Sequence, residues 1–274
     1  MTTERELLAD VMALAERAGE AILAIYGDSA RWQLQQKADD SPLTAADLAA
    51  HEVIAAGLRS LALQAPLLSE ESAPEELLGR HDWHRFWLVD PLDGTKEFLA
   101  RNGEFSVNIA LVAGHEVVLG VVHGPVSGVS YVAARGQGAH RVERGEWRPL
   151  RVASLPVAGG RPLRLTVSRR HGGDCLARFE QAVTARLGPV SSWPAGSAFK
   201  ICAVAEGAAD AYPRFGPTSE WDTAAAQVVL EEAGGHLLSP TGQRFRYNCR
   251  DSLLNGSFLA VGDQPERWLA CWPL

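Results

Sequence analysis

The N-terminal quarter of the chain carries apolar residues at helical spacing. They recur every three or four positions from Leu7 to Ile25, and the pattern stops near Gly27, as at the end of an amphipathic helix. The polar sequence QQKADDSPLT follows. Its last residue, Thr44, stands where an N-cap would open a second apolar-periodic stretch from Ala50 to Leu61. We expect two helices here, joined by a polar loop.

The central region has the shorter period of β-strands. Residues 86–89 form an apolar run that stops at Asp90-Pro91, and apolar and polar residues then alternate from Phe105 to Leu111, as in a half-buried strand. Apolar runs follow at 117–122 and 131–133. We expect an antiparallel meander in this region.

From about residue 156, strand-like and helix-like segments take turns. Strand-like runs at 163–167, 209–212 and 259–261 are separated by helical spacing at 174–187, at 197–206 and from Asp222 to Gly234-Gly235, where paired glycines are typical of a helix end. The pattern predicts a mixed α+β and α/β protein with two lobes. The N-terminal α+β lobe covers residues 1–155, and the C-terminal α/β lobe covers residues 156–274.

Composition and charge narrow the class of protein. The net charge of −7 argues against a nucleic-acid polymer as partner, because such binding needs a basic face. The sequence has no apolar run long enough to span a bilayer, no signal-peptide pattern at its N-terminus, and four scattered cysteines without a CxxC pair. We therefore expect a cytoplasmic protein with reduced thiols. An acidic pocket can still hold phosphate once divalent cations have neutralised it.

The sequence Asp90-Pro91-Leu92-Asp93-Gly94-Thr95 is the sharpest local feature. Two carboxylates lie three residues apart directly after an apolar strand, where they can converge on a hard cation such as Mg²⁺. Gly94 and Thr95 can open a helix whose backbone N–H groups bind a phosphate oxygen. The structural alternative is that Asp93 is only a turn and cap residue, and Asp90 a polar strand end.

Three further acidic positions have both a structural and a functional interpretation. Glu70-Glu71 is a solvated surface pair or a source of metal ligands. Asp222 is an ordinary helix N-cap or a ligand, and Asp47 is the acid of a capping box with Thr44 or part of a catalytic site. Carboxylates that meet in one cleft repel one another unless cations neutralise them, which is the arrangement of a multi-metal phosphatase site.

Taken together, DPLDGT, the upstream SEES and the downstream EWDTAA resemble the inositol monophosphatase superfamily of Mg²⁺-dependent phosphatases. The resemblance extends from KADDSPLTAAD to GGHLLSPTG and implies the layered αβαβα sugar-phosphatase fold. The sequences DPLDGTKEFLARNGEFSVNIAL and GSAFKICAVAEGAADAYPRFGPTSEWDTAAAQ are similar to CysQ-type 3′(2′),5′-bisphosphate nucleotidases, because Lys96-Glu97-Phe98 replaces the TNF-like continuation of inositol monophosphatases.

The resemblance implies a reaction and a role for each motif residue. The reaction is hydrolysis of adenosine 3′,5′-bisphosphate (PAP) to AMP and phosphate, with action on the sulfated analogue PAPS as well. It would use two or three Mg²⁺ ions and a water oriented and deprotonated by Thr95 and Asp47. The implied metal ligands are Glu70, Asp90, the Leu92 carbonyl, Asp93 and Asp222. The implied substrate contacts are Glu70, Leu92, Asp93, Gly94, Thr95, His171, Gly196, Lys200 and Asp222.

Several alternatives stay open at this point. An inositol-phosphate or sugar-phosphate phosphatase would share the metal site, and a non-catalytic nucleotide or metal sensor could use the same scaffold. The family resemblance also allows peripheral association with the inner membrane. Arg169, Arg170 and Arg214 are further candidates for a second anionic group of the substrate. The sequence leaves the oligomeric state unknown.

Overall fold

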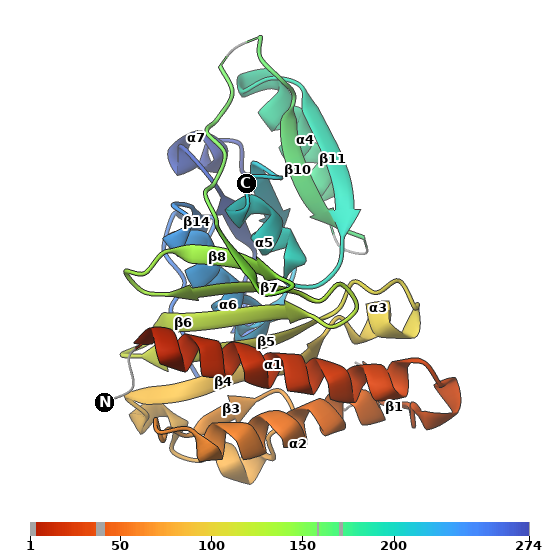
Figure 1. Ribbon diagram of the computed structural model, residues 1–274. Helices are drawn as coiled ribbons and strands as arrows, with labels where there is room; N and C mark the ends of the chain where they lie inside the picture. The colour runs from red at the N-terminus through yellow and green to blue at the C-terminus, as the bar shows by residue number, and fades with distance from the viewer. Residues whose placement is uncertain (1–3, 37–41, 158, 170–171, 274) are drawn as a thin grey trace.

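Helices and sheets alternate in five layers in the computed structural model, which describes residues 4–36, 42–157, 159–169 and 172–273. Two helices cover one face of a seven-stranded sheet, two more separate it from a five-stranded sheet, and the last two cover the outer face of that second sheet (Figure 1). Three apolar cores fill the spaces between these layers. The predicted αβαβα fold is therefore confirmed.

The outer helical layer consists of α1 (Glu4–Tyr26) and α2 (Ala45–Ser60). Their apolar stripes, from Leu8 to Ile25 and from Ala46 to Leu58, pack against Trp87, Val89 and their neighbours on the first sheet. Thr44 caps α2 as the sequence predicted, and Asp47 closes a capping box with it. The local signals and the tertiary packing agree in this layer.

The first sheet has the order β3-β4-β5-β6-β7-β8-β9 and is antiparallel except between β3 and β4. Its interior strands are buried on both faces. Trp87 and Val89 face α1 and α2, while Phe86 and Leu88 face the central core. The strands are β3 (Leu67–Ser69), β4 (Arg85–Asp93), β5 (Ser106–Ala113), β6 (Glu116–Gly124), β7 (Val129–Ala134), β8 (Ala139–Glu143) and β9 (Glu146–Pro149).

The middle layer consists of α5 (Phe199–Ala205) and α6 (Glu220–Glu232). Residues 223–230 of α6 are all buried, because the helix packs on sheet strands with one face and on the second half of the chain with the other. Its small residues let it approach the first sheet closely. A Cβ added at Gly120 on β6 would overlap the carbonyl oxygen of Ala225.

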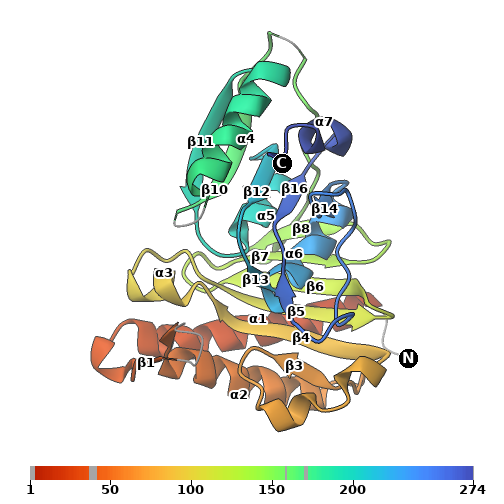
Figure 2. The same cartoon turned by 180° about the vertical axis from the view of Figure 1, so that it is seen from behind.

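The second sheet has the order β11-β10-β12-β16-β14, with α4 (Gly173–Arg186) and α7 (Pro265–Leu269) on its outer face (Figure 2). Its strands are β10 (Leu163–Ser168), β11 (Val190–Ala195), β12 (Ala211–Arg214), β14 (His236–Leu238) and β16 (Phe258–Val261). Short elements complete the chain: β1 (Gln35–Gln36) with β2 (Pro42–Leu43), α3 (Thr95–Leu99), and β13 (Thr218–Ser219) with β15 (Leu254–Asn255).

The first sheet ends at residue 149 and the second begins at residue 163. The lobe boundary between residues 155 and 156 stays a prediction. Within the described ranges no helix combines the length and apolar character needed to cross a bilayer.

The close approach of α6 to β6 gives the first testable prediction. Gly120→Ala should lower the free energy of unfolding by about 1–3 kcal/mol, because the new methyl group must displace helix backbone. Gly27→Ala is the matched control, since Gly27 is exposed and a Cβ there would meet nothing within 4 Å. Urea unfolding of both variants measures the difference, and equal stability would contradict the packing described here.

Candidate metal centre and adjoining cavity

A bulge in β4 places Asp90 and Asp93 on the same side of the sheet. Asp90 pairs with Asn108 and Asp93 pairs with Ser106, so three steps along β4 match two steps along β5. In a regular strand, side chains three residues apart point to opposite faces. The extra residue of the bulge brings these two side chains to the same face. The Leu92 N–H donates to Asp90 Oδ1 at 3.0 Å, and Gly94, with φ +93°, ends the turn.

Asp222 reaches the same place from the N-terminus of α6. Ser219, not Asp222, is the N-cap of this helix, so the N-cap interpretation was wrong. Asp222 is the acid three residues into the helix, and its Oδ2 accepts a hydrogen bond from the Ser219 N–H at 2.8 Å. One oxygen holds the helix start, which leaves the other for the cleft.

Ligand oxygens from Asp90, Asp93 and Asp222 all lie within 4.8 Å of one another. Burial raises the pKa of Asp90 well above its usual range, and the negative charges of Glu70, Asp93, Asp222 and Asp47 raise it further. Burial, Asp93 and Glu70 likewise raise the pKa of Asp222. Close, like-charged oxygens fit hard divalent cations, whose charge removes the repulsion.

Asp47 and Thr95 form the second predicted pair. Asp47 Oδ2 accepts hydrogen bonds from the Thr44 N–H at 2.8 Å and the Thr44 hydroxyl at 2.7 Å. Its other oxygen, Oδ1, lies 3.3 Å from the Thr95 hydroxyl. Because α2 covers one face of the first sheet and α6 the other, Asp47 and Asp222 approach the end of β4 from opposite sides.

Asp93 has polar support that the sequence did not indicate. Its Oδ2 accepts hydrogen bonds from the Ser197 hydroxyl at 2.6 Å and from the Asn108 amide at 3.4 Å. Ser106 in turn contacts both Asn108 and Ser197. Asn108 and Ser106 occupy the polar positions of an alternating strand, which predicts exposure, so only the register of β4 and β5 reveals their role.

A cavity of about 140 Å³ adjoins the carboxylates. It is lined by Asp93 and Asp222 and by three cationic residues of the second half of the chain, Lys200, Arg214 and Arg169. Gly196 also lines it, and a Cβ at Gly196 would lie 2.5 Å from the Glu104 carbonyl oxygen. The structure thus brings Gly196 and Lys200 beside the acidic centre, while His171 and Arg170 lie outside the described residues.

The cations in this cavity are held in different ways. Lys200 is buried, its ammonium donates to the Ser197 carbonyl at 2.6 Å, and burial lowers its pKa to about 8. Arg169 forms a two-point ion pair with Glu104, at 2.5 and 3.2 Å. Arg214 is buried and donates to the Pro217 carbonyl at 2.9 Å. Positive charge therefore lines the wall next to the acidic cluster.

These features define a class: a layered αβαβα protein with a multi-carboxylate cation site beside a cationic cavity. The model of the inositol monophosphatase family matches residues 3–268. The chain is 46% identical to the Salmonella typhimurium protein named 3′(2′),5′-bisphosphate nucleotidase CysQ, over 92% of this chain and 98% of that one. It is 45% identical to the Escherichia coli K12 protein of the same name, with the same coverage.

Solved structures agree with the sequence relatives. The crystal structure of CysQ from Bacteroides thetaiotaomicron superposes with a TM-score of 0.78 at 38% identity, covering 94% of this chain and 98% of that one. An inositol monophosphatase from Anabaena shares the fold, with a TM-score of 0.72 over 98% and 96% of the two chains. The chain belongs to the inositol monophosphatase family. The resemblance carried by the acidic motifs, including its CysQ-type branch, is thereby confirmed.

The raised carboxylate pKa values predict how stability responds to pH without metal. Between about pH 4 and pH 8, folded Asp222 keeps a proton that the unfolded chain has lost, because its pKa rises from 3.8 to about 8. The folded state then binds more protons, so the free energy of unfolding should fall as pH rises through this window. Urea unfolding in EDTA from pH 5 to pH 8 measures this change in the free energy of unfolding.

Saturating Mg²⁺ should restore the free energy of unfolding that is lost as pH rises. At a hundredfold excess over the dissociation constant, the stabilisation should be about 2.7 kcal/mol. Asp90→Asn should raise stability in EDTA, since it removes a repelling charge, and should weaken the response to Mg²⁺. Asp174→Asn, an exposed carboxylate on α4, serves as control. Identical curves in EDTA and Mg²⁺ at pH 8 would contradict the metal site.

Proposed function

We propose that this protein is a 3′(2′),5′-bisphosphate nucleotidase that hydrolyses the 3′-phosphate of PAP, giving AMP and phosphate. The observation that carries the proposal is the shared cavity. Its acidic end suits the cations that bind one phosphate, and its cationic wall suits a second anionic group. The identity of 46% to a CysQ nucleotidase over nearly its whole length supports the same reaction.

We propose that the site binds two or three Mg²⁺ ions through five groups. They are the carboxylates of Glu70, Asp90, Asp93 and Asp222 and the carbonyl of Leu92. When bound, Mg²⁺ lowers the pKa of water and offsets charge on the phosphoryl oxygens. Clustered oxygen ligands and raised carboxylate pKa values favour this assignment.

The remaining chemistry belongs to side chains and backbone around the turn. We assign the Thr95 hydroxyl to orient the attacking water, with Asp47 Oδ1, 3.3 Å from that hydroxyl, drawing the proton away. The amides of Gly94 and Thr95 are proposed donors to the phosphoryl group undergoing attack. No serine, cysteine or histidine nucleophile is required.

The second anionic group of the substrate is proposed to bind at the cationic wall. Lys200 and Gly196 lie there, and His171 keeps its proposed role from the family resemblance. A 5′-phosphosulfate would offer the same negative charge, which is why PAPS is a proposed second substrate. Inositol 1-phosphate has a single phosphate group and so lacks a partner for this wall.

A cytoplasmic location is proposed with the same function. All four cysteines, at positions 175, 202, 249 and 271, are free thiols, and Cys202 and Cys271 are buried. Unpaired buried thiols suit a reducing compartment.

A substrate panel tests the reaction. Phosphate release from PAP, PAPS, inositol 1-phosphate and fructose 1,6-bisphosphate is measured with Mg²⁺ and with EDTA. We expect Mg²⁺-dependent turnover with the highest kcat/KM for PAP or PAPS. A higher kcat/KM for inositol 1-phosphate or the sugar would instead favour a phosphatase of another branch, and Mg²⁺ binding without turnover would favour a sensor.

Thr95 variants test the proton path separately from metal binding. Thr95→Val should lower kcat by about 10²–10⁴-fold, since it removes the hydroxyl between water and Asp47. Thr95→Ser keeps that hydroxyl and should stay close to the parent enzyme. Both should retain the stabilisation by Mg²⁺ on heating. Full activity of the valine variant would remove Thr95 from the mechanism.

A further inference from the structure

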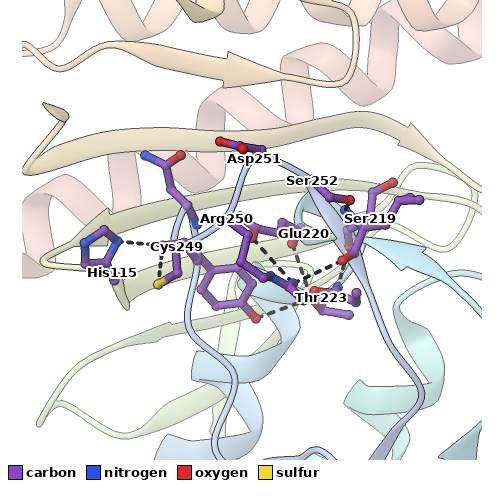
Figure 3. A network of polar contacts seen from close by, with 12 residues as sticks. His115, Ser219, Glu220, Thr223, Cys249, Arg250, Asp251 and Ser252 are labelled. Carbon is purple, nitrogen blue, oxygen red and sulfur yellow. Dashed lines mark hydrogen bonds and ion pairs between the residues drawn. The ribbon is translucent and has the colours of Figure 1, made fainter. Parts of the chain in front are cut away.

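The start of α6 has a second carboxylate, Glu220, which does not face the cavity and is buried. Glu220 precedes Asp222 by two residues, and its exposed fraction is 0%. Figure 3 shows it beside the chain segment that carries Cys249, Arg250, Asp251 and Ser252. Glu220 does not line the cavity that Asp222 lines. The proposed mechanism therefore gives this carboxylate no part in the chemistry.

Glu220 ties the first turn of α6 to residues 247–255, called here the bracing segment. Its Oε2 accepts a hydrogen bond from the Asn248 N–H at 2.7 Å, and its own N–H donates to the Leu253 carbonyl at 2.8 Å. The Asn255 side-chain amide donates to the Ser219 carbonyl at 2.8 Å and to the Thr223 hydroxyl at 3.0 Å. Residues near both ends of the bracing segment are thus hydrogen-bonded to the start of α6.

Arg80 holds the same bracing segment from the other side. Its guanidinium donates to Asn248 Oδ1 and, at 2.8 Å, to the Arg250 carbonyl. The Asn248 amide donates back to the Arg80 carbonyl at 2.5 Å. Arg80 is buried although it is charged. Asn248 therefore contacts Glu220 through its backbone and Arg80 through its side chain.

This chain of contacts joins the start of α6 to the segment that leads into β4. Arg80 lies five positions before β4, the strand that ends in Asp90 and Asp93, while Glu220 lies two positions before Asp222. The carboxylates on these two pieces of chain repel one another, so the polar link adds to the apolar packing that holds α6 on the first sheet. Arg80, Asn248 and Glu220 are all buried, so solvent does not compete for this link.

Burying a carboxylate is unfavourable unless its hydrogen bonds and counter-charges compensate. Glu220 Oε1 has no hydrogen-bond partner among the described residues, and Arg250 Nη2 is 4.0 Å away. Its single strong hydrogen bond goes to the bracing segment. We propose that Glu220 is a positioning residue that fixes Asp222 relative to Asp90 and Asp93, an inference that rests on the proposed metal-dependent function.

The test compares two glutamates of the same helix. Glu220→Ala cuts the link at the first turn. Glu231→Ala, the matched control, removes the two contacts at 2.6 and 2.7 Å that tie the last turn of α6 to Arg244, and a hydrogen bond of 2.8 Å from the Gln227 amide. For each variant, the Mg²⁺ concentration that gives half of the maximal thermal stabilisation is measured, together with kcat and KM for PAP at saturating Mg²⁺.

Glu220→Ala should raise the half-saturating Mg²⁺ concentration by about 10–100-fold, the usual effect of removing a residue that holds a metal ligand in place. Its kcat should fall while KM for PAP at saturating Mg²⁺ stays near the parent value. Glu220→Gln keeps an acceptor for the Asn248 N–H and should restore most of the Mg²⁺ affinity. Glu231→Ala should lower the melting temperature without changing the Mg²⁺ dependence.

Asn248→Gly covers the case in which Glu220→Ala does not fold. Asn248 has φ +56°, which glycine adopts freely. This variant keeps the N–H for Glu220 but loses the side-chain link to Arg80, so it too should raise the half-saturating Mg²⁺ concentration. Parent-like Mg²⁺ saturation in a folded variant of either position, or an equal shift in Glu231→Ala, would overturn the proposal. A parent protein that binds Mg²⁺ but releases no phosphate would overturn the function alone.

Discussion

The mutual repulsion of clustered carboxylates is the constraint that organises this molecule. Asp90, Asp93 and Asp222 present oxygens within 4.8 Å of one another, an arrangement that opposes folding until cations neutralise it. The structure can tolerate it because each carboxylate comes from an element that large apolar layers fix in place. The central core holds α6 on the first sheet, and the outer core holds α2 on the opposite face. The unfavourable site is thus supported by packing elsewhere.

The same local structure, a capping box, positions Asp47 and Asp222 at this site. Each is the acid three residues into a helix, with Oδ2 on the backbone N–H of the N-cap residue, Thr44 or Ser219. Capping fixes one carboxylate oxygen of each residue, and the other oxygen of Asp47 lies 3.3 Å from the Thr95 hydroxyl. From the sequence, capping and function are competing interpretations of these aspartates. In the structure the two interpretations are compatible, because the cap supplies the orientation that the proposed ligand and base need.

Much of this could be predicted because the signals are local. Helical spacing located α1 and α2, but the strand end expected at Asp90-Pro91 was wrong, because a bulge lets β4 continue to Asp93. The bulge that turns Asp90 and Asp93 to one side depends on pairing with Asn108 and Ser106, which are distant in sequence. The support that Ser197 gives Asp93 crosses from one half of the chain to the other. Such contacts follow from tertiary register, which neither periodicity nor motif spacing encodes, and α7 is too short to show a period.

Selectivity follows from the charge of the whole cavity more than from the metal centre alone. The acidic cluster suits any phosphomonoester once cations are bound, as the shared fold of the family implies. Lys200 and Arg214 are both buried beside that cluster, and taking two cations out of water is unfavourable unless negative charge compensates. Asp93 is near enough to Lys200 to favour its charged form, yet its oxygens are also proposed metal ligands. A substrate with a second anionic group would add negative charge at this cationic wall, which a monophosphate would not supply.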